Sequence, residues 1–134
     1  MQTLTVTSEM RAPIGGAFYP TGFSMVMYPT QQQALDAAEC MTRKHFTQED
    51  IFLVPPAVTL SEIAPTADDS NGPLPSYGTD GSTVRTFRKL ADAGYFGLLV
   101  RTPQAEDKLH LRDAIRGTAY ALAQRYSTLV IEDL

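Results

Sequence analysis

With 134 residues, of which 43% are apolar and 19% charged, the chain has the composition of one globular domain. Its net charge of −4, from 11 basic and 15 acidic residues, argues against general nucleic-acid binding. The single cysteine, Cys40, excludes an intramolecular disulfide. No apolar run approaches the roughly 20 residues that a membrane-spanning helix needs. Because the first residues also lack the pattern of a secretory signal, we expect a cytoplasmic protein.

Residues 1–20 are predicted to form an N-terminal arm. Thr3 to Thr7 alternate polar and apolar side chains, which predicts a strand, and Gly15-Gly16 is interpreted as part of a flexible linker. A strand on such a linker needs a sheet edge, in its own sheet or in a neighbouring protomer. We favour the neighbouring protomer and therefore expect a homodimer.

Residues 21–134 are predicted to be a single domain that begins with an apolar strand. This strand, Phe23 to Tyr28, is apolar on both faces. We expect helices on one face and another element, such as a partner chain, on the other. Thr30 and Gln33 then match a helix capping box, and the helix should run to about Lys44 with one apolar stripe, consisting of Ala34, Ala37, Ala38 and Met41.

A second strand, Ile51 to Val54, precedes a long connection over residues 55–81. This connection holds five of the nine prolines and no basic residue, so it cannot sustain a long regular element. A short helix is expected near Leu60 to Ile63. We also expect that residues 66–80 can be deleted without loss of the fold, because loop-closure entropy changes slowly with length.

The last third of the chain again alternates helices and strands. Ser82 or Asp80 should cap a helix that buries a stripe before Gly94. Phe96 to Arg101 is typical of a strand buried on both faces. Thr102-Pro103 should then begin a helix that ends near Arg116. Two closing strands are expected within residues 120–126 and 129–132. The apolar stripe of the helix expected before Gly94 consists of Val84, Phe87, Leu90 and Ala91.

Taken in order, these elements predict an α+β domain of the ferredoxin-like, split β-α-β kind. In that arrangement the first and third strands of the unit lie at the centre of the sheet, and here these are the two most apolar strands. The connection at 55–81 is an insertion with its own helix. The final strand is an addition to the plan.

Within residues 23–56, the segment YPTQQQALDAAECMTRKHFTQEDIFLVPP joins an apolar strand, a turn, an Ala-rich helix, an acidic pair and a second strand. This pattern resembles the general stress protein 17M-like domain family. The resemblance implies a bacterial, stress-associated domain without assigned chemistry. It transfers no catalytic residue to this chain.

No catalytic residue, metal site or cofactor is predicted from the remaining motifs. Cys40 lies toward the wrong end of its helix for a reactive thiol, so a packing or surface role is expected. His45 and His110 have no metal-ligand spacing and are interpreted as helix-end and helix-face residues. No nucleophile elbow is present in the sequence.

Three functional hypotheses follow. The leading one is a non-catalytic binding or regulatory module that acts as a homo-oligomer. The second is an enzyme or ligand-binding protein that takes a small molecule on the sheet face, with five candidate lining residues: Tyr28, Arg101, Tyr120, Arg125 and Tyr126. The third is RNA binding through Gly94 to Val100. The cations Arg85, Arg88 and Lys89 are interpreted as a solvated helix face rather than a phosphate-binding patch.

Overall fold

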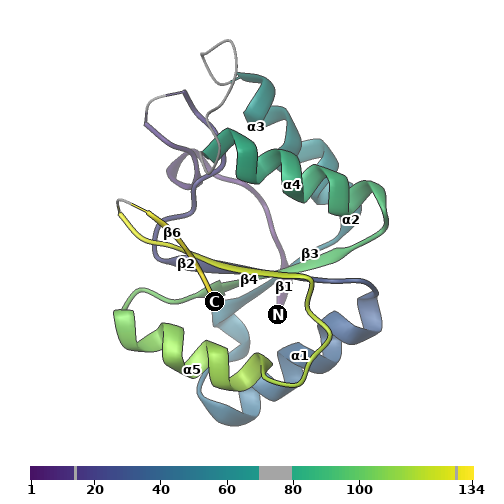
Figure 1. Ribbon diagram of the computed structural model, residues 1–134, viewed down its shortest axis with the longest axis vertical. Helices are drawn as coiled ribbons and strands as arrows, with labels where there is room; N and C mark the ends of the chain where they lie inside the picture. The colour runs from purple at the N-terminus through teal and green to yellow at the C-terminus, as the bar shows by residue number, and fades with distance from the viewer. Residues whose placement is uncertain (14, 70–79, 129) are drawn as a thin grey trace.

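The computed structural model describes residues 1–13, 15–69, 80–128 and 130–134. These residues form a mixed α+β structure around one six-stranded sheet, in the order β1-β3-β4-β2-β5-β6. Figure 1 shows the sheet nearly edge-on across the middle of the molecule, with helices above and below it. The strands are β1 (Gln2–Thr3), β2 (Phe23–Tyr28), β3 (Ile51–Val54), β4 (Phe96–Arg101), β5 (Leu122–Tyr126) and β6 (Ile131–Asp133).

The two central strands are β4 and β2, which pair antiparallel along their whole length, from Phe23 opposite Arg101 to Tyr28 opposite Phe96. β3 and β5 flank this pair: β3 is antiparallel to β4, and β5 is antiparallel to β2. At the edge of the sheet, β1 pairs with β3 in parallel. The expected strands at 23–28, 51–54 and 96–101 are therefore confirmed with their boundaries. The second closing strand begins at Ile131, and Leu129 lies outside the described residues.

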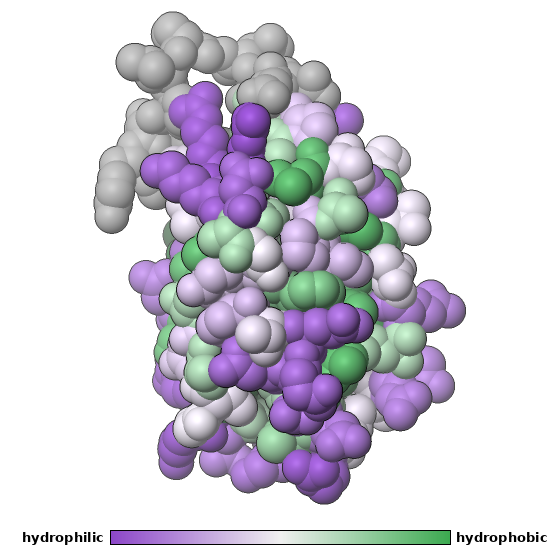
Figure 2. Space-filling view, turned by 90° about the vertical axis from the view of Figure 1, so that its right-hand side faces the viewer, coloured by the Kyte–Doolittle hydropathy of each residue, from purple (hydrophilic) through white to green (hydrophobic). Residues whose placement is uncertain are grey.

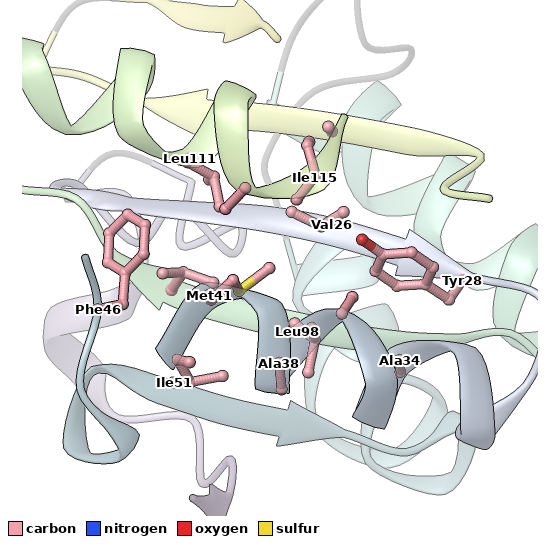
Figure 3. Close-up of a cluster of buried hydrophobic side chains, with 14 residues drawn as sticks. Val26, Tyr28, Ala34, Ala38, Met41, Phe46, Ile51, Leu98, Leu111 and Ile115 are labelled. Atoms are coloured by element: carbon pink, nitrogen blue, oxygen red, sulfur yellow. The ribbon is translucent and has the colours of Figure 1, made fainter. Parts of the chain in front are cut away.

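One face of the sheet is covered by α1 (Gln31–Lys44) and α5 (Ala105–Ile115). The predicted stripe of α1 is buried as expected, and the Thr30 hydroxyl caps the helix by accepting from the Gln33 amide at 3.2 Å. Figure 3 shows this cluster, in which α1 places Met41 and Ala38 against strand residues Val26 and Leu98 while α5 contributes Leu111 and Ile115. Every second residue of the central strands points into this layer.

The opposite face is covered by the chain itself, so the other element expected there is a set of its own helices rather than a partner chain. The covering helices are α2 (Pro56–Val58), a π-helical turn (Thr59–Ile63), α3 (Ala64–Asp69) and α4 (Asp80–Asp92). Met25, Met27 and Leu99 pack from the sheet against Val84 and Phe87 of α4. Because both apolar faces are buried within one chain, they no longer support a homodimer.

The N-terminal arm is an integral part of this second layer, and the flexible linker expected at Gly15-Gly16 is instead an ordered turn. Arg11 forms an antiparallel β-bridge with Phe18. Gly15 and Gly16 adopt positive φ values of 85° and 73°, which residues other than glycine rarely adopt. Phe18 is fully buried against Phe87 and Tyr126. The strand predicted from Thr3 to Thr7 is shorter and earlier, and it lies at the edge of its own sheet.

The connection at 55–81 also contributes to the core. The expected helix near Leu60 to Ile63 is confirmed, but helical structure extends from Pro56 to Asp69. The buried Thr66 hydroxyl accepts from the Phe18 amide at 2.9 Å and donates to the Ile63 carbonyl at 2.6 Å. Ala67 packs beside it. Thr66 and Ala67 therefore attach the start of residues 66–80 to the core, whereas residues 70–79 lie outside the described residues, so the tolerance of the fold to deletion of 66–80 stays a prediction.

Two helix starts differ from those predicted. Asp80 and Ser82 both lie within α4, so neither is the residue that precedes it. α5 begins after Gln104 rather than at Thr102-Pro103. The backbone N–H of Gln104 donates to the Asp107 carboxylate at 2.8 Å. Thr102 is instead buried, with its hydroxyl hydrogen-bonded to that of Ser24 at 2.8 Å. A partner from another strand decided this boundary, and local capping patterns do not contain that information.

Candidate functional site

The five residues proposed as a ligand-binding set do not come together. Tyr28 is buried in the layer of α1 and α5, whereas Tyr126 is buried on the other side of the sheet. Tyr120 is exposed before β5, and Arg101 is exposed at the end of β4. Both sheet faces are covered by helices, so no open sheet face is left for a ligand or for stacked RNA bases among the described residues.

Tyr28 and Arg125 have structural surroundings. The Tyr28 hydroxyl is hydrogen-bonded to that of Thr118 at 2.9 Å, and burial raises the pKa of Tyr28 to about 12. Arg125 donates from Nε to the Thr102 carbonyl at 3.1 Å and from Nη1 to Glu132 at 2.9 Å. These contacts link β5 to β6 and to the segment after β4, and they leave the Arg125 side chain only 9% exposed.

Arg101 also has intramolecular partners. Its Nε lies 3.7 Å from the Asp50 carboxylate, and its guanidinium carbon lies 5.0 Å from the centre of the Phe23 ring. Such a cation–π contact together with a half-exposed ion pair is typical of a side chain that packs along the surface.

The two histidines lie together, which the sequence did not indicate. The rings of His45, after α1, and His110, in α5, stack with 3.9 Å between centroids, and His45 Nε2 lies 3.4 Å from Asp107. Within the described part of the chain, no group of three or more His, Cys, Asp or Glu residues is placed to hold a metal ion. Cys40 is partly buried, and its sulfur accepts a hydrogen bond from Arg43 at 3.3 Å.

Three basic side chains that form no ion pair in the described structure lie together in a groove between α3 and α4. This groove, called the α4 cationic groove below, has a volume of about 260 Å³. Arg85, Arg88 and Lys89 line it at i, i+3 and i+4, a spacing that places three side chains on one face of a helix. The remaining lining is Ala64, Ala67, Val84 and Asp92.

Within the described structure, these three cations differ from most basic side chains of this chain because they form no ion pair. Seven of the eleven basic side chains form an ion pair or a side-chain hydrogen bond. In the described structure the remaining four, Arg85, Arg88, Lys89 and Arg112, form neither. Three of those four share the α4 cationic groove. With Asp92 included, the described lining residues of the groove carry a formal charge of +2 in a protein whose net charge is −4.

The face of the molecule in Figure 2 mixes polar and apolar side chains. Figure 2, which shows the molecule from the right-hand side of Figure 1, has hydrophilic side chains gathered toward the top, and lower down it has apolar side chains interspersed with polar ones. The exposed large apolar residues come from separate elements and include Leu60, Leu109 and Val130. Scattered residues of this kind are normal on a protein surface.

The sequence contained part of the signal for this groove. The i, i+3, i+4 spacing of the cations was visible, but we interpreted them as a solvated face. The sequence could not show the second wall of the groove, which α3 forms, because α3 is brought against α4 only by the tertiary structure. A larger groove of about 330 Å³ lies along α1, but its Asp36 and Glu39 already have partners in Gln32 and Arg43.

Comparisons with known proteins found no match to this chain among family models, curated proteins or solved structures. No helix among the described residues is both long and apolar enough to cross a membrane.

Proposed function

We propose that the core of this chain is a ferredoxin-like split β-α-β unit. Its support is the strand order β3-β4-β2-β5, in which the first and third strands of the unit are central and all neighbours are antiparallel. The two helices that follow β2 and β4, α1 and α5, lie on the same face. β1 and β6 then extend the two edges, and the helices between β3 and β4 cover the second face.

Residues 28–56 contribute the end of β2, then α1 and β3, in the order shared with the general stress protein 17M-like pattern. Membership of that family, with its bacterial and stress-associated role, therefore remains part of this proposal, as does a cytoplasmic location. A homodimer is left out, because the arm pairs within its own sheet and both sheet faces are covered by the chain's own helices.

For function, we propose a non-catalytic module that binds a small organic anion in the α4 cationic groove. The observation that carries this proposal is the set of three cations, Arg85, Arg88 and Lys89, which form no ion pair among the described residues and lie beside an apolar floor. Arginine guanidinium groups bind phosphate and carboxylate oxygens with two parallel hydrogen bonds, and lysine adds a point charge. Ala64 and Ala67 of α3 keep a small accessible surface in the lining and offer contact for an apolar part of the ligand.

The proposal is tested with phenyl phosphate as the probe and phenol as its neutral counterpart, by calorimetry at 0.15 M salt. We expect phenyl phosphate to bind and phenol not to bind, because the anionic group supplies the charge that the groove lacks. The variant Arg85→Gln/Arg88→Gln/Lys89→Gln should abolish binding while the protein stays folded, since all three side chains are exposed.

A charge-matched control is Arg43→Gln/Arg112→Gln/Arg116→Gln, which removes three positive charges from α1 and the region of α5 on the opposite layer. This variant should bind phenyl phosphate like the wild type. An equal loss in both variants would show only nonspecific attraction and would contradict the proposal. Tighter binding of single-stranded RNA than of phenyl phosphate would favour the RNA-binding hypothesis instead.

A further inference from the structure

The edge of the sheet at β1 is open in the described structure. β1 is a terminal strand of the sheet, and its residues Gln2 and Thr3 are both exposed. The Leu4 amide donates to the Leu53 carbonyl at 2.8 Å, so Leu4 directs its N–H toward β3. Because successive residues of a strand direct their backbone groups to opposite sides, the N–H and C=O of Thr3 point away from β3. Such an edge is a template for another extended chain.

A groove lies beside this edge, between β1 and α1. One part of it, of about 330 Å³, is lined by α1 and Met1, and the other part, of about 290 Å³, is lined by β1 and the start of β3. The two parts share Met1, Gln48 and Ile51 and therefore lie side by side. Together they are called the β1 edge groove below.

The accessible apolar side chains of the groove lie where an added strand would need them. Leu35 of α1 is half-buried, and Met1 is exposed. An added strand would lie about 4.8 Å beyond β1, and every second side chain of it would point toward the layer of α1. Those side chains would enter the groove and contact Leu35 and Met1.

The ionised side chains that line the groove are all acidic. Asp36 and Glu39 line the first part and Glu49 lines the second, and all three are exposed. Even with the α-amino group of Met1 counted, three carboxylates and one ammonium give the described lining a formal charge of −2. Arg43 lies 3.8 Å from Glu39, but both side chains are largely exposed, so this pair is weak.

We propose that the β1 edge groove binds an extended peptide segment of a partner protein, in which apolar residues lie between basic ones. The peptide backbone pairs with Thr3, its apolar side chains pack on Leu35 and Met1, and its basic side chains lie near the three carboxylates. A second copy of this chain fits less well, because two paired β1 edges would bring two sets of the same carboxylates together. The groove shares no lining residue with the α4 cationic groove.

The test is a titration of the full chain with the peptide acetyl-Lys-Val-Leu-Val-Lys-amide, followed by backbone amide chemical shifts. We expect saturable shifts at Thr3, Gln48 and Glu49. The charge-reversed peptide acetyl-Glu-Val-Leu-Val-Glu-amide should not bind. Equal affinity for the two peptides, or shifts confined to other elements, would overturn the inference.

Strand pairing is tested separately, with two versions of the basic peptide that are N-methylated at the odd or at the even positions. In an added strand only one of these two sets of N–H groups faces β1, so one version should lose binding and the other should retain it. Equal affinity of the two versions would exclude pairing with the edge. This measurement needs no variant of the protein.

The edge residue Thr3 offers a matched pair of variants. Thr3→Pro removes the outward N–H and should abolish peptide binding, whereas Thr3→Ala keeps this N–H and should bind. Proline is tolerated on an edge strand where the N–H faces solvent, so both variants should fold. Wild-type affinity in folded Thr3→Pro would overturn the inference. A dimer of the chain that Thr3→Pro dissociates would assign the edge to a second copy instead.

A second pair of variants tests the contribution of charge. Asp36→Asn/Glu49→Gln should lower the affinity for the basic peptide about fivefold, because two exposed carboxylates near the peptide are neutralised. Glu106→Gln/Asp133→Asn removes the same charge from α5 and β6 and should bind like the wild type. Equal losses in both variants would show only general attraction of cations and would contradict the proposal.

Discussion

Arg125 Nη1 lies 2.9 Å from Glu132 Oε2. The two residues are directly opposite each other in the antiparallel pair of β5 and β6, so this ion pair joins the last two strands. The Arg125 side chain is only 9% exposed, and Glu132 is 29% exposed. Lys108 of α5 reaches the other carboxylate oxygen at 3.3 Å. The short terminal strand is thereby attached both to its neighbour and to a helix.

Arg125→Met should lower the free energy of unfolding by about 1–3 kcal/mol, because the buried Thr102 carbonyl loses its Arg125 donor and Glu132 loses its closest cation. Denaturant unfolding measures this change. Arg112→Met is the control, since Arg112 makes no ion pair in the described structure, and its effect should stay within about 0.5 kcal/mol. Equal effects of the two substitutions would show that the Arg125 contacts contribute no specific stability.

The same contacts predict how stability depends on pH. Hydrogen bonds from Arg125 and then Lys108 hold the pKa of Glu132 below its ordinary value of 4.5. A lowered folded-state pKa means that this contribution is present above the unfolded-state value and is lost as pH falls through the folded-state value. As the pH is lowered from 6, the free energy of unfolding should therefore fall less steeply in Glu132→Gln than in the wild type. Parallel curves would contradict this account.

Gly97, the second residue of β4, should not tolerate a larger residue. A Cβ at this position would lie 3.0 Å from the sulfur atoms of Met25 and Met27 and 3.2 Å from Val54 Cβ. Overpacking of this kind costs about 1–3 kcal/mol, so Gly97→Ala should lower the free energy of unfolding by that amount. Met27→Ala in the same chain should recover part of the loss, and strictly additive effects would show that the sulfur contact is not the cause.

Leu4 tests whether the N-terminal arm belongs to the core. Its side chain is 1% exposed and packs in the layer of α4, so Leu4→Ala should reduce the free energy of unfolding by about 2–5 kcal/mol. Thr5→Ala, at the exposed neighbouring position, should have little effect. A wild-type melting curve for Leu4→Ala would restore the interpretation of residues 1–20 as a separate arm.

Local pattern alone determined most of the regular elements. The apolar run at Phe96–Arg101 and the Thr30 cap each depend on neighbouring residues in the chain, and the structure places both where they were expected. The buried stripe of α1 follows from the helical repeat in the same way. These features need no knowledge of the rest of the chain.

Only the tertiary structure decided what covers the second face of the sheet. The sequence shows that Met25 and Leu99 are apolar, but it does not show that Phe18 and Phe87 meet there from segments on either side of β2 and β3. For the same reason it could not show that Tyr28 and Tyr126 lie on opposite faces, or that α3 forms a wall beside the cations of α4. Periodicity specifies which face of an element is buried, whereas the partner of that face depends on long-range packing.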